Sequence, residues 1–292
     1  MFESLAPLDP DVRDAYLTRL GVEPEPPSVA ALQRLVRRHS ERVPYETFWI
    51  HAGEAWDIDP HAAARRVALE QRGGYCYHLN GAFGLLLGSL GYTVRGHVGG
   101  VEIAASPDPE ARGNHLVLTV ALSPSEESPA GIWYVDDGLG DALHEALPLV
   151  AGPVRQAPFD LSLEQTDDDT WHLTHDPAGG FAGMAWTTGI ARPADFLEKH
   201  HWLSTSPESG FVQVAMAETR DATGVDVVQG LVLKRLGADA RTDAPLTRRE
   251  DWFAMLADVF GLTFSATAPE VRDRLWDTVL EAHRRREESA ER

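Results

Sequence analysis

The first 90 residues place apolar side chains at the spacing of α-helices. The segment DPDVRDAYLTRLG (9–21) begins with a capping Asp-Pro pair, keeps its apolar residues on one face and ends at a glycine. Two further helices are predicted, one from Ser28 and one from Asp59 to the glycine pair at 73–74. Helical spacing of leucine and phenylalanine then continues up to Gly91. The chain therefore opens with a helical region.

The pattern changes at Tyr92 to short β-rich runs separated by glycine, proline and serine. Four runs stand in the middle of the chain: YTVRGHV (92–98), HLVLTVAL (115–122), IWYVD (132–136) and TWHLTH (170–175). Later strands are predicted at FVQVAMA (211–217) and VVQGLVLKRL (227–236), followed by two helices, the first with a capping box from Thr247 to Glu250. The tail RRREESAER is expected to fray. The predicted order along the chain is a helical region, then a β-rich region, then a region that mixes helices and strands.

Composition and charge narrow the possible functions. With 292 residues, 43% apolar and 24% charged, the chain has the composition of a globular protein with room for two or three cores. The net charge of −19 argues against a broad surface for nucleic acid or acidic membranes. No apolar run approaches the length of a membrane span, and the opening MFESLAPLDP lacks the pattern of a signal peptide. We therefore expect a cytoplasmic protein.

The single cysteine lies in the segment RGGYCYHLNGAF (72–83). The apolar spacing places Cys76 in the first turn of a helix, where free N–H groups and the helix dipole stabilise a thiolate. The two preceding glycines allow the backbone to turn sharply and to approach a ligand. The alternative is a small buried hydrophobe in a core. A lone cysteine cannot form an internal disulfide.

A nucleophilic cysteine needs a base and an acceptor that orients the base. His115 opens a strong strand, and Asp136 ends the next β-run, so both side chains fall at one end of a sheet if these strands are neighbours. The alternative is that both are ordinary turn or strand-end residues. A metal site is not predicted, because His172 and His175 fall on opposite strand faces and paired-cysteine motifs are absent.

Five motifs in this order resemble the arylamine N-acetyltransferases. They are VPYE (43–46), RGGYCYHLNGAF, the histidine of GNHLVLTV (113–120), the aspartate of WYVDDGLG (133–140) and HHWLSTSP (200–207). Cys76 and His115 are 39 residues apart and His115 and Asp136 are 21 apart, far closer than in papain-like proteases. The resemblance covers most of the chain.

The resemblance implies an α+β fold with a cysteine-protease-like Cys-His-Asp core. A helical bundle (1–91) would carry the cysteine motif, a β-barrel domain (92–205) the histidine and aspartate, and an α/β lid (206–292) would complete the fold. Cys76 would be the nucleophile, His115 the base and Asp136 the residue that orients it. Arg72 and Glu46 would form a supporting ion pair.

The activity that the resemblance implies is ping-pong acyl transfer. Cys76 would take an acetyl group from acetyl-coenzyme A as a thioester and pass it to the nitrogen of an arylamine or hydrazine. Acetyl-coenzyme A would be a co-substrate, and no cofactor would be bound permanently. Asn114 and the turn formed by Gly138, Leu139 and Gly140 would contact the coenzyme.

Two residues depart from the family pattern. His78 stands where the family has glutamate, and since helix positions i and i+2 point about 200° apart, it should face away from the thiol. Leu139 replaces an aromatic residue that lines the substrate pocket in the family. Three alternatives stay open: an amide synthase that uses a carrier-bound acyl chain, a cysteine hydrolase, and a non-catalytic binding homologue.

Overall fold

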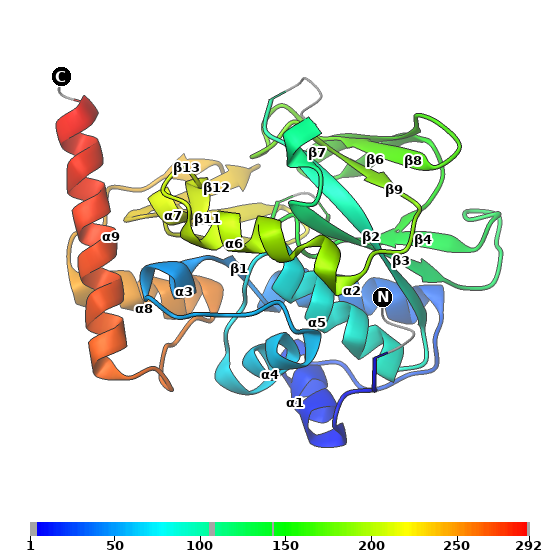
Figure 1. The fold of residues 1–292 in the computed structure, drawn as a ribbon, viewed down its shortest axis with the longest axis horizontal. Helices are drawn as coiled ribbons and strands as arrows, with labels where there is room; N and C mark the ends of the chain where they lie inside the picture. The colour runs from blue at the N-terminus through cyan, green and yellow to red at the C-terminus, as the bar shows by residue number, and fades with distance from the viewer. Residues whose placement is uncertain (1–4, 105–108, 142, 291–292) are drawn as a thin grey trace.

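The computed structural model describes residues 5–104, 109–141 and 143–290 and begins with five helices (Figure 1). The helices are α1 (Pro10–Leu20), α2 (Val29–Arg42), α3 (Phe48–His51), α4 (Pro60–Glu70) and α5 (Cys76–Ser89). The predicted caps are present, because Asp9 accepts from the backbone of Asp11 and Ser28 from that of Ala31. Gly21 ends α1 in the left-handed conformation, with φ of 64°.

Helix α5 is a core helix. Every residue from Cys76 to Leu87 is buried, so the helix is enclosed on all sides. It packs against α4 on one side and against the strands β2 (Thr93–Glu102) and β3 (His115–Ala121) on the other. This packing fixes the position of its first turn, which carries Cys76.

The middle of the chain forms an eight-stranded antiparallel sheet in the order β5-β4-β3-β2-β9-β8-β7-β6. Its remaining strands are β4 (Ile132–Val135), β5 (Leu147–Pro148), β6 (Gly152–Gln156), β7 (Phe159–Gln165), β8 (Thr170–Thr174) and β9 (Gly183–Thr187). Strands β5 and β6 form the two opposite edges yet are joined by residues 149–151 alone. Because four Cα–Cα steps span at most roughly 14 Å, the sheet must curl. It is an open half-barrel, where the sequence predicted a barrel.

The two faces of this sheet bury two separate cores. Leu116, Leu118 and Val120 on β3 pack with the helices, whereas Val117 on the same strand packs inside the half-barrel with Tyr134. Alternate residues of a strand point to opposite faces, so a strand that is buried on both faces is a continuous apolar run. Burial on both faces explains why HLVLTVAL (115–122) is a nearly continuous apolar run.

A second sheet has the order β1-β10-β11-β12-β13. Its strands are β1 (Tyr45–Glu46), β10 (Met216–Arg220), β11 (Gly224–Gln229), β12 (Val232–Gly237) and β13 (Arg241–Thr242). Strand β1 comes from the helical region, and β11 adds Val225 and Val227 to the core of the half-barrel. The three predicted regions are thus joined through shared strands and cores, and the division at residues 91 and 205 stays a prediction.

Four more helices and two short 3₁₀ turns are present in the described residues. They are α6 (Leu197–Thr205), α7 (Gly210–Gln213), α8 (Arg249–Phe260), α9 (Pro269–Ala290), η2 (Pro109–Ala111) and η3 (Pro193–Asp195). Figure 1 shows α9 at the end of the molecule opposite the strands β6–β8. In the described residues, no helix combines the length and apolar character that a membrane crossing requires.

Three sequence predictions for the last region are wrong. FVQVAMA divides between α7 and β10, because Ser209 caps a short helix by accepting from the backbone of Phe211. Helix α8 has Arg248 as its N-cap with no side-chain bond, so the predicted capping box is absent. The tail continues α9 to Ala290, with paired side chains four residues apart at His283 and Glu287 and at Glu281 and Arg285, and its last two residues, 291–292, lie outside the described residues.

Candidate active site

Cys76 is the first residue of α5 and is 3% exposed. The glycine pair before it is needed for close packing: a Cβ on Gly73 would lie 1.8 Å from the carbonyl oxygen of Pro44, and one on Gly74 would lie 2.6 Å from the Cβ of His78. The thiol Sγ lies 3.4 Å from the backbone oxygen of Asn114, the residue before β3. The helix start therefore holds the thiol against the beginning of the histidine strand.

His115 and Asp136 meet as predicted. Nε2 of His115, at the start of β3, lies 3.0 and 2.9 Å from the two carboxylate oxygens of Asp136, just after the neighbouring antiparallel strand β4. Burial lowers the pKa of His115, but the Asp136 carboxylate and the neighbouring Cys76 outweigh it and raise that pKa to about 10. The ring can therefore keep its proton at neutral pH.

Three groups besides His115 hold the Asp136 carboxylate. The side chain of Asn80 donates to Oδ1 at 2.6 Å, the backbone of Gly138 donates to Oδ1 at 3.1 Å, and the Tyr134 hydroxyl donates to Oδ2 at 3.0 Å. These bonds fix the carboxylate, which is 1% exposed, against the ring of His115.

Asn80 is a functional candidate that the sequence analysis missed. Besides Asp136, its amide nitrogen donates to the carbonyl of Leu116 at 2.6 Å, and its Oδ1 accepts from the backbone of Asp137 at 3.0 Å. It stands four residues after Cys76 in α5, which places it on the same helix face. This spacing of four residues from Cys76 was the signal in the sequence that could have identified Asn80. Asn80 ties the nucleophile helix to both strands of the triad.

The turn after Asp136 packs against the nucleophile. A Cβ on Gly138 would lie 2.8 Å from the Cα of Cys76, so only glycine fits there. Gly140 has φ of 72°, and a Cβ there would lie 1.9 Å from Oε2 of Glu218. The side chain of Leu139 is 7% exposed and packs in the half-barrel core. A coenzyme contact at this turn, with Asn114 on the other side of the thiol, stays a prediction.

The side chain of Asn114 is already engaged. Its Oδ1 accepts from the backbone of Val101 at 2.8 Å and its amide donates to the carbonyl of Val101 at 3.1 Å. These bonds fix the loop before His115 to strand β2. The carbonyl of Asn114, rather than its amide, faces the thiol.

The ion pair predicted between Arg72 and Glu46 is present and buried. Nε and Nη2 of Arg72 each lie 2.9 Å from Oε1 of Glu46, whose Oε2 accepts from the backbone of Phe48 at 2.8 Å. The pair joins the loop before Cys76 to strand β1. The pair therefore supports the loop that carries Cys76, and neither residue belongs to the triad.

His78 faces away from the thiol, as predicted, into an aromatic cluster. Its ring centroid lies 4.8 Å from that of Tyr75, 5.4 Å from Trp49 and 5.6 Å from Trp56. Nε2 donates to the carbonyl of Asp57 at 3.0 Å. Burial, and then nearby positive charge, lowers the pKa of His78 well below its ordinary value. His78 is thus a neutral structural residue.

An acidic side chain borders the turn at 138–140. Glu218 on β10 is half-buried and contacts Gly140, and it is the strand partner of Tyr45. Burial raises the pKa of Glu218 well above its ordinary value, and the charge of Asp141 adds to this.

In the described part of the chain, no three His, Cys, Asp or Glu residues gather as a possible metal site.

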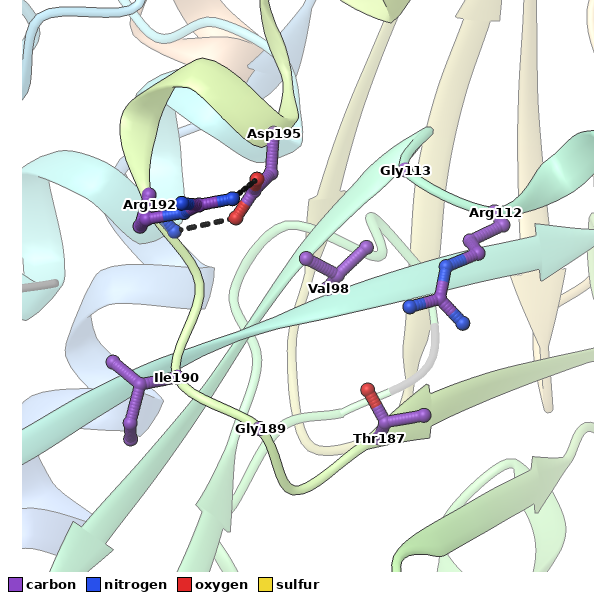
Figure 2. A pocket seen from close by; sticks show the side chains of 8 residues that line it. All are labelled: Val98, Arg112, Gly113, Thr187, Gly189, Ile190, Arg192 and Asp195. Atoms are coloured by element: carbon purple, nitrogen blue, oxygen red, sulfur yellow. Dashed lines mark hydrogen bonds and ion pairs between the residues drawn. The ribbon is translucent and has the colours of Figure 1, made fainter.

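A cavity of about 490 Å³ opens on the other side of the loop that precedes His115. Figure 2 shows Val98 and Ile190 among its apolar lining, with Arg112 and Thr187 also bordering it and Arg192 paired with Asp195. Gly113, two residues before His115, lines this cavity, and its carbonyl accepts from the hydroxyl of Tyr77 at 2.6 Å. No triad residue lines this cavity.

Comparisons with known proteins agree with this geometry. The N-acetyltransferase family model matches residues 28–268. The chain is 33% identical over 205 residues to the arylamine N-acetyltransferase of Mycolicibacterium smegmatis, covering 68% of this chain and 72% of that protein. It is 35% identical over 277 residues to an N-malonyltransferase of Gibberella moniliformis, covering 80% and 78%.

Solved structures share the fold. The arylamine N-acetyltransferase of Mycobacterium marinum in complex with coenzyme A superposes with a TM-score of 0.80 at 26% identity, over 92% of this chain and 98% of that one. The Salmonella typhimurium enzyme gives 0.80 at 24% identity, over 94% and 99%. With a family model that matches most of the sequence and a relative above 30% identity, the chain belongs to the arylamine N-acetyltransferase family and is an acetyltransferase enzyme.

Proposed function

We propose that the protein transfers an acetyl group from acetyl-coenzyme A to the nitrogen of an arylamine or hydrazine through a thioester on Cys76. The observation that carries the proposal is the buried His115, held by Asp136 on one side and interacting with Cys76 on the other. A thiolate paired with an imidazolium is a nucleophile at neutral pH.

The two half-reactions follow from these three residues. The Cys76 thiolate attacks the acetyl carbonyl, the bond to the coenzyme sulfur breaks, and the departing thiolate takes the proton of the His115 imidazolium. The neutral imidazole then accepts a proton from the amine as its nitrogen attacks the thioester, which restores the thiolate–imidazolium pair. Asp136 keeps the ring oriented throughout.

Cations beside the loop at 112–114 support an anionic donor. In a chain of net charge −19, a coenzyme with phosphate groups needs local positive charge. Arg112 and Arg192 border the cavity beside Gly113, and Lys199 donates to the backbone of Glu110 at 2.7 Å. The phosphates would lie near these side chains, while the thioester passes the turn at 138–140.

A malonyl donor is the second candidate, because the Gibberella moniliformis relative is an N-malonyltransferase. Competition between equal amounts of acetyl-coenzyme A and malonyl-coenzyme A distinguishes the two donors. The mass of the acyl group that accumulates on Cys76 identifies the preferred one, and we expect acetyl.

Mass spectrometry of the intact protein tests the proposal. After mixing with acetyl-coenzyme A and no amine, one acetyl group should appear on the peptide that contains Cys76, and hydroxylamine should remove it. Cys76→Ala is the control and should gain none. Addition of an arylamine should regenerate the free thiol and yield the acetylated amine. Release of free acetate without amine would instead identify a hydrolase, and labelling only by a carrier-bound chain would identify an amide synthase.

A further inference from the structure

A second buried histidine–aspartate pair lies directly behind the triad. Nδ1 of His39, on α2, lies 3.6 Å from Oδ2 of Asp137, and both side chains are fully buried. Nε2 of His39 lies 2.8 Å from the hydroxyl of Tyr16 on α1. The ring also packs against Phe83 of α5, with centroids 4.6 Å apart. The pair is therefore fixed by three helices of the bundle.

The Asp137 carboxylate has unusual surroundings. Neither of its oxygens accepts a hydrogen bond in the described residues, whereas buried carboxylates ordinarily accept several. Its backbone N–H donates to Asn80, and the amide of Asn80 donates to Asp136. Asp137 is thus joined to the triad by two hydrogen bonds through one side chain.

Two consecutive buried carboxylates create an electrostatic problem. An uncompensated negative charge on Asp137 would disfavour the charged form of Asp136 and of the Cys76 thiol. Burial raises the pKa of Asp137, and the charge of His39 opposes that rise. A positive charge next to Asp137 would therefore favour the charged forms of Asp136 and of the Cys76 thiol.

Among the titratable and charged groups around this pair, His39 is the basic group that faces Asp137 directly. His144 also acts on Asp137, but its Nε2 is paired with Glu41 at 3.1 Å. Arg19 acts on Tyr16, and its guanidinium donates to three backbone carbonyls. The other neighbours are Asp136 and the Tyr16 hydroxyl.

We propose that His39 is a positioning residue which, as an imidazolium, compensates the charge of Asp137 so that Asp136 and the Cys76 thiolate can both stay ionised. It acts through Asp137 and Asn80 and does not touch the substrate. The proposal rests on the proposed function only in taking Cys76 as the nucleophile.

Three variants test this charge balance by the pH dependence of Cys76 alkylation with iodoacetamide. His39→Gln leaves Asp137 uncompensated, so the inflection should move to higher pH by about 0.5 unit or more. Asp137→Asn leaves His39 uncompensated, so the inflection should move to lower pH. The double variant has neither charge and should return toward the wild-type inflection. Stability changes alone would not produce opposite shifts that cancel.

His51→Gln is the matched control, because His51 is buried and its ring bonds to backbone groups of Phe211 and Val214 rather than to a carboxylate. It should change the melting temperature without moving the inflection. Equal shifts in His39→Gln and the double variant, or no shift in either single variant, would overturn the proposal. If His39→Gln does not fold, the downward shift in Asp137→Asn decides alone, and its absence overturns the proposal.

A wild-type inflection near an ordinary thiol value of about 8.5 would count against the proposed function. The shifts between variants would still be measurable, so the two failures are distinguishable.

Discussion

The two sides of the first turn of α5 place histidines in opposite environments. On one side His115 meets the Asp136 carboxylate, and its pKa rises to about 10. On the other side His78 meets three aromatic rings and a backbone carbonyl, and its pKa falls well below the ordinary value. Both rings are buried to the same degree, at 1% and 0% exposure. The difference shows that a neighbouring carboxylate, rather than burial, decides whether the pKa of a buried histidine rises or falls.

Replacement of that carboxylate should have the largest effect. Asp136→Asn should lower kcat/KM by about 10³ to 10⁴, because the amide no longer stabilises the imidazolium and permits the wrong tautomer. Steady-state kinetics and circular dichroism check the rate and the fold. Asp141→Asn is the control, since Asp141 is equally buried and accepts from the backbone of Gly180 at 2.7 Å. Near-normal turnover in folded Asp136→Asn would exclude the triad.

Loss of Asn80 should have the next largest effect. Asn80→Ala removes the amide that donates to Asp136 and leaves the backbone of Asp137 without its acceptor, so kcat should fall by about 10- to 100-fold. KM for the acyl donor should change little. Single-turnover acetylation of Cys76 measures the loss. Asn80→Asp should not restore the rate, because a carboxylate would repel Asp136.

The pH dependence of stability should run in opposite directions for the two histidines. His115, with its raised pKa, stabilises the folded protein fully below 6.5 and loses that contribution as pH rises to about 10. His78, with its lowered pKa, stabilises it above 6.5 and loses that contribution as pH falls.

Urea unfolding at several pH values compares wild type with two variants. Asp136→Asn should weaken the alkaline loss, and His78→Phe should weaken the acid loss, each by on the order of 1 kcal/mol or more. If the free energy of unfolding depends on pH in the same way in wild type and in His78→Phe, His78 is not held neutral.

The smallest effect on catalysis is expected at His78. His78→Glu, the residue of the family pattern, should change the rate of Cys76 acetylation by less than about tenfold, because the side chain faces the aromatic cluster and not the thiol. The melting temperature should fall, since a carboxylate would replace a neutral ring. A rate change beyond tenfold would show that the two sides of the turn are coupled.

Much of the site could be predicted because its signals are local. The glycine pair, the position of Cys76 at a helix start and the strand that begins at His115 are readable from spacing and residue type. The late helices were harder to predict from the sequence. Ser209 starts a short helix inside a β-like run, and in the described structure Arg248 caps α8 without a side-chain bond. Local propensity is a weak guide where packing decides.

The sequence by itself determined the succession of a helical, a β-rich and a mixed region and the candidate positions of Cys76, His115 and Asp136, because periodicity and motif spacing are properties of short segments. Only the tertiary structure decided that His39 faces Asp137, that Asn80 bridges two strands and that aromatic rings keep His78 neutral. These contacts join residues far apart in the chain. A histidine has the same ordinary pKa at every position in a sequence, and its charge in the protein depends on which groups the fold brings beside it.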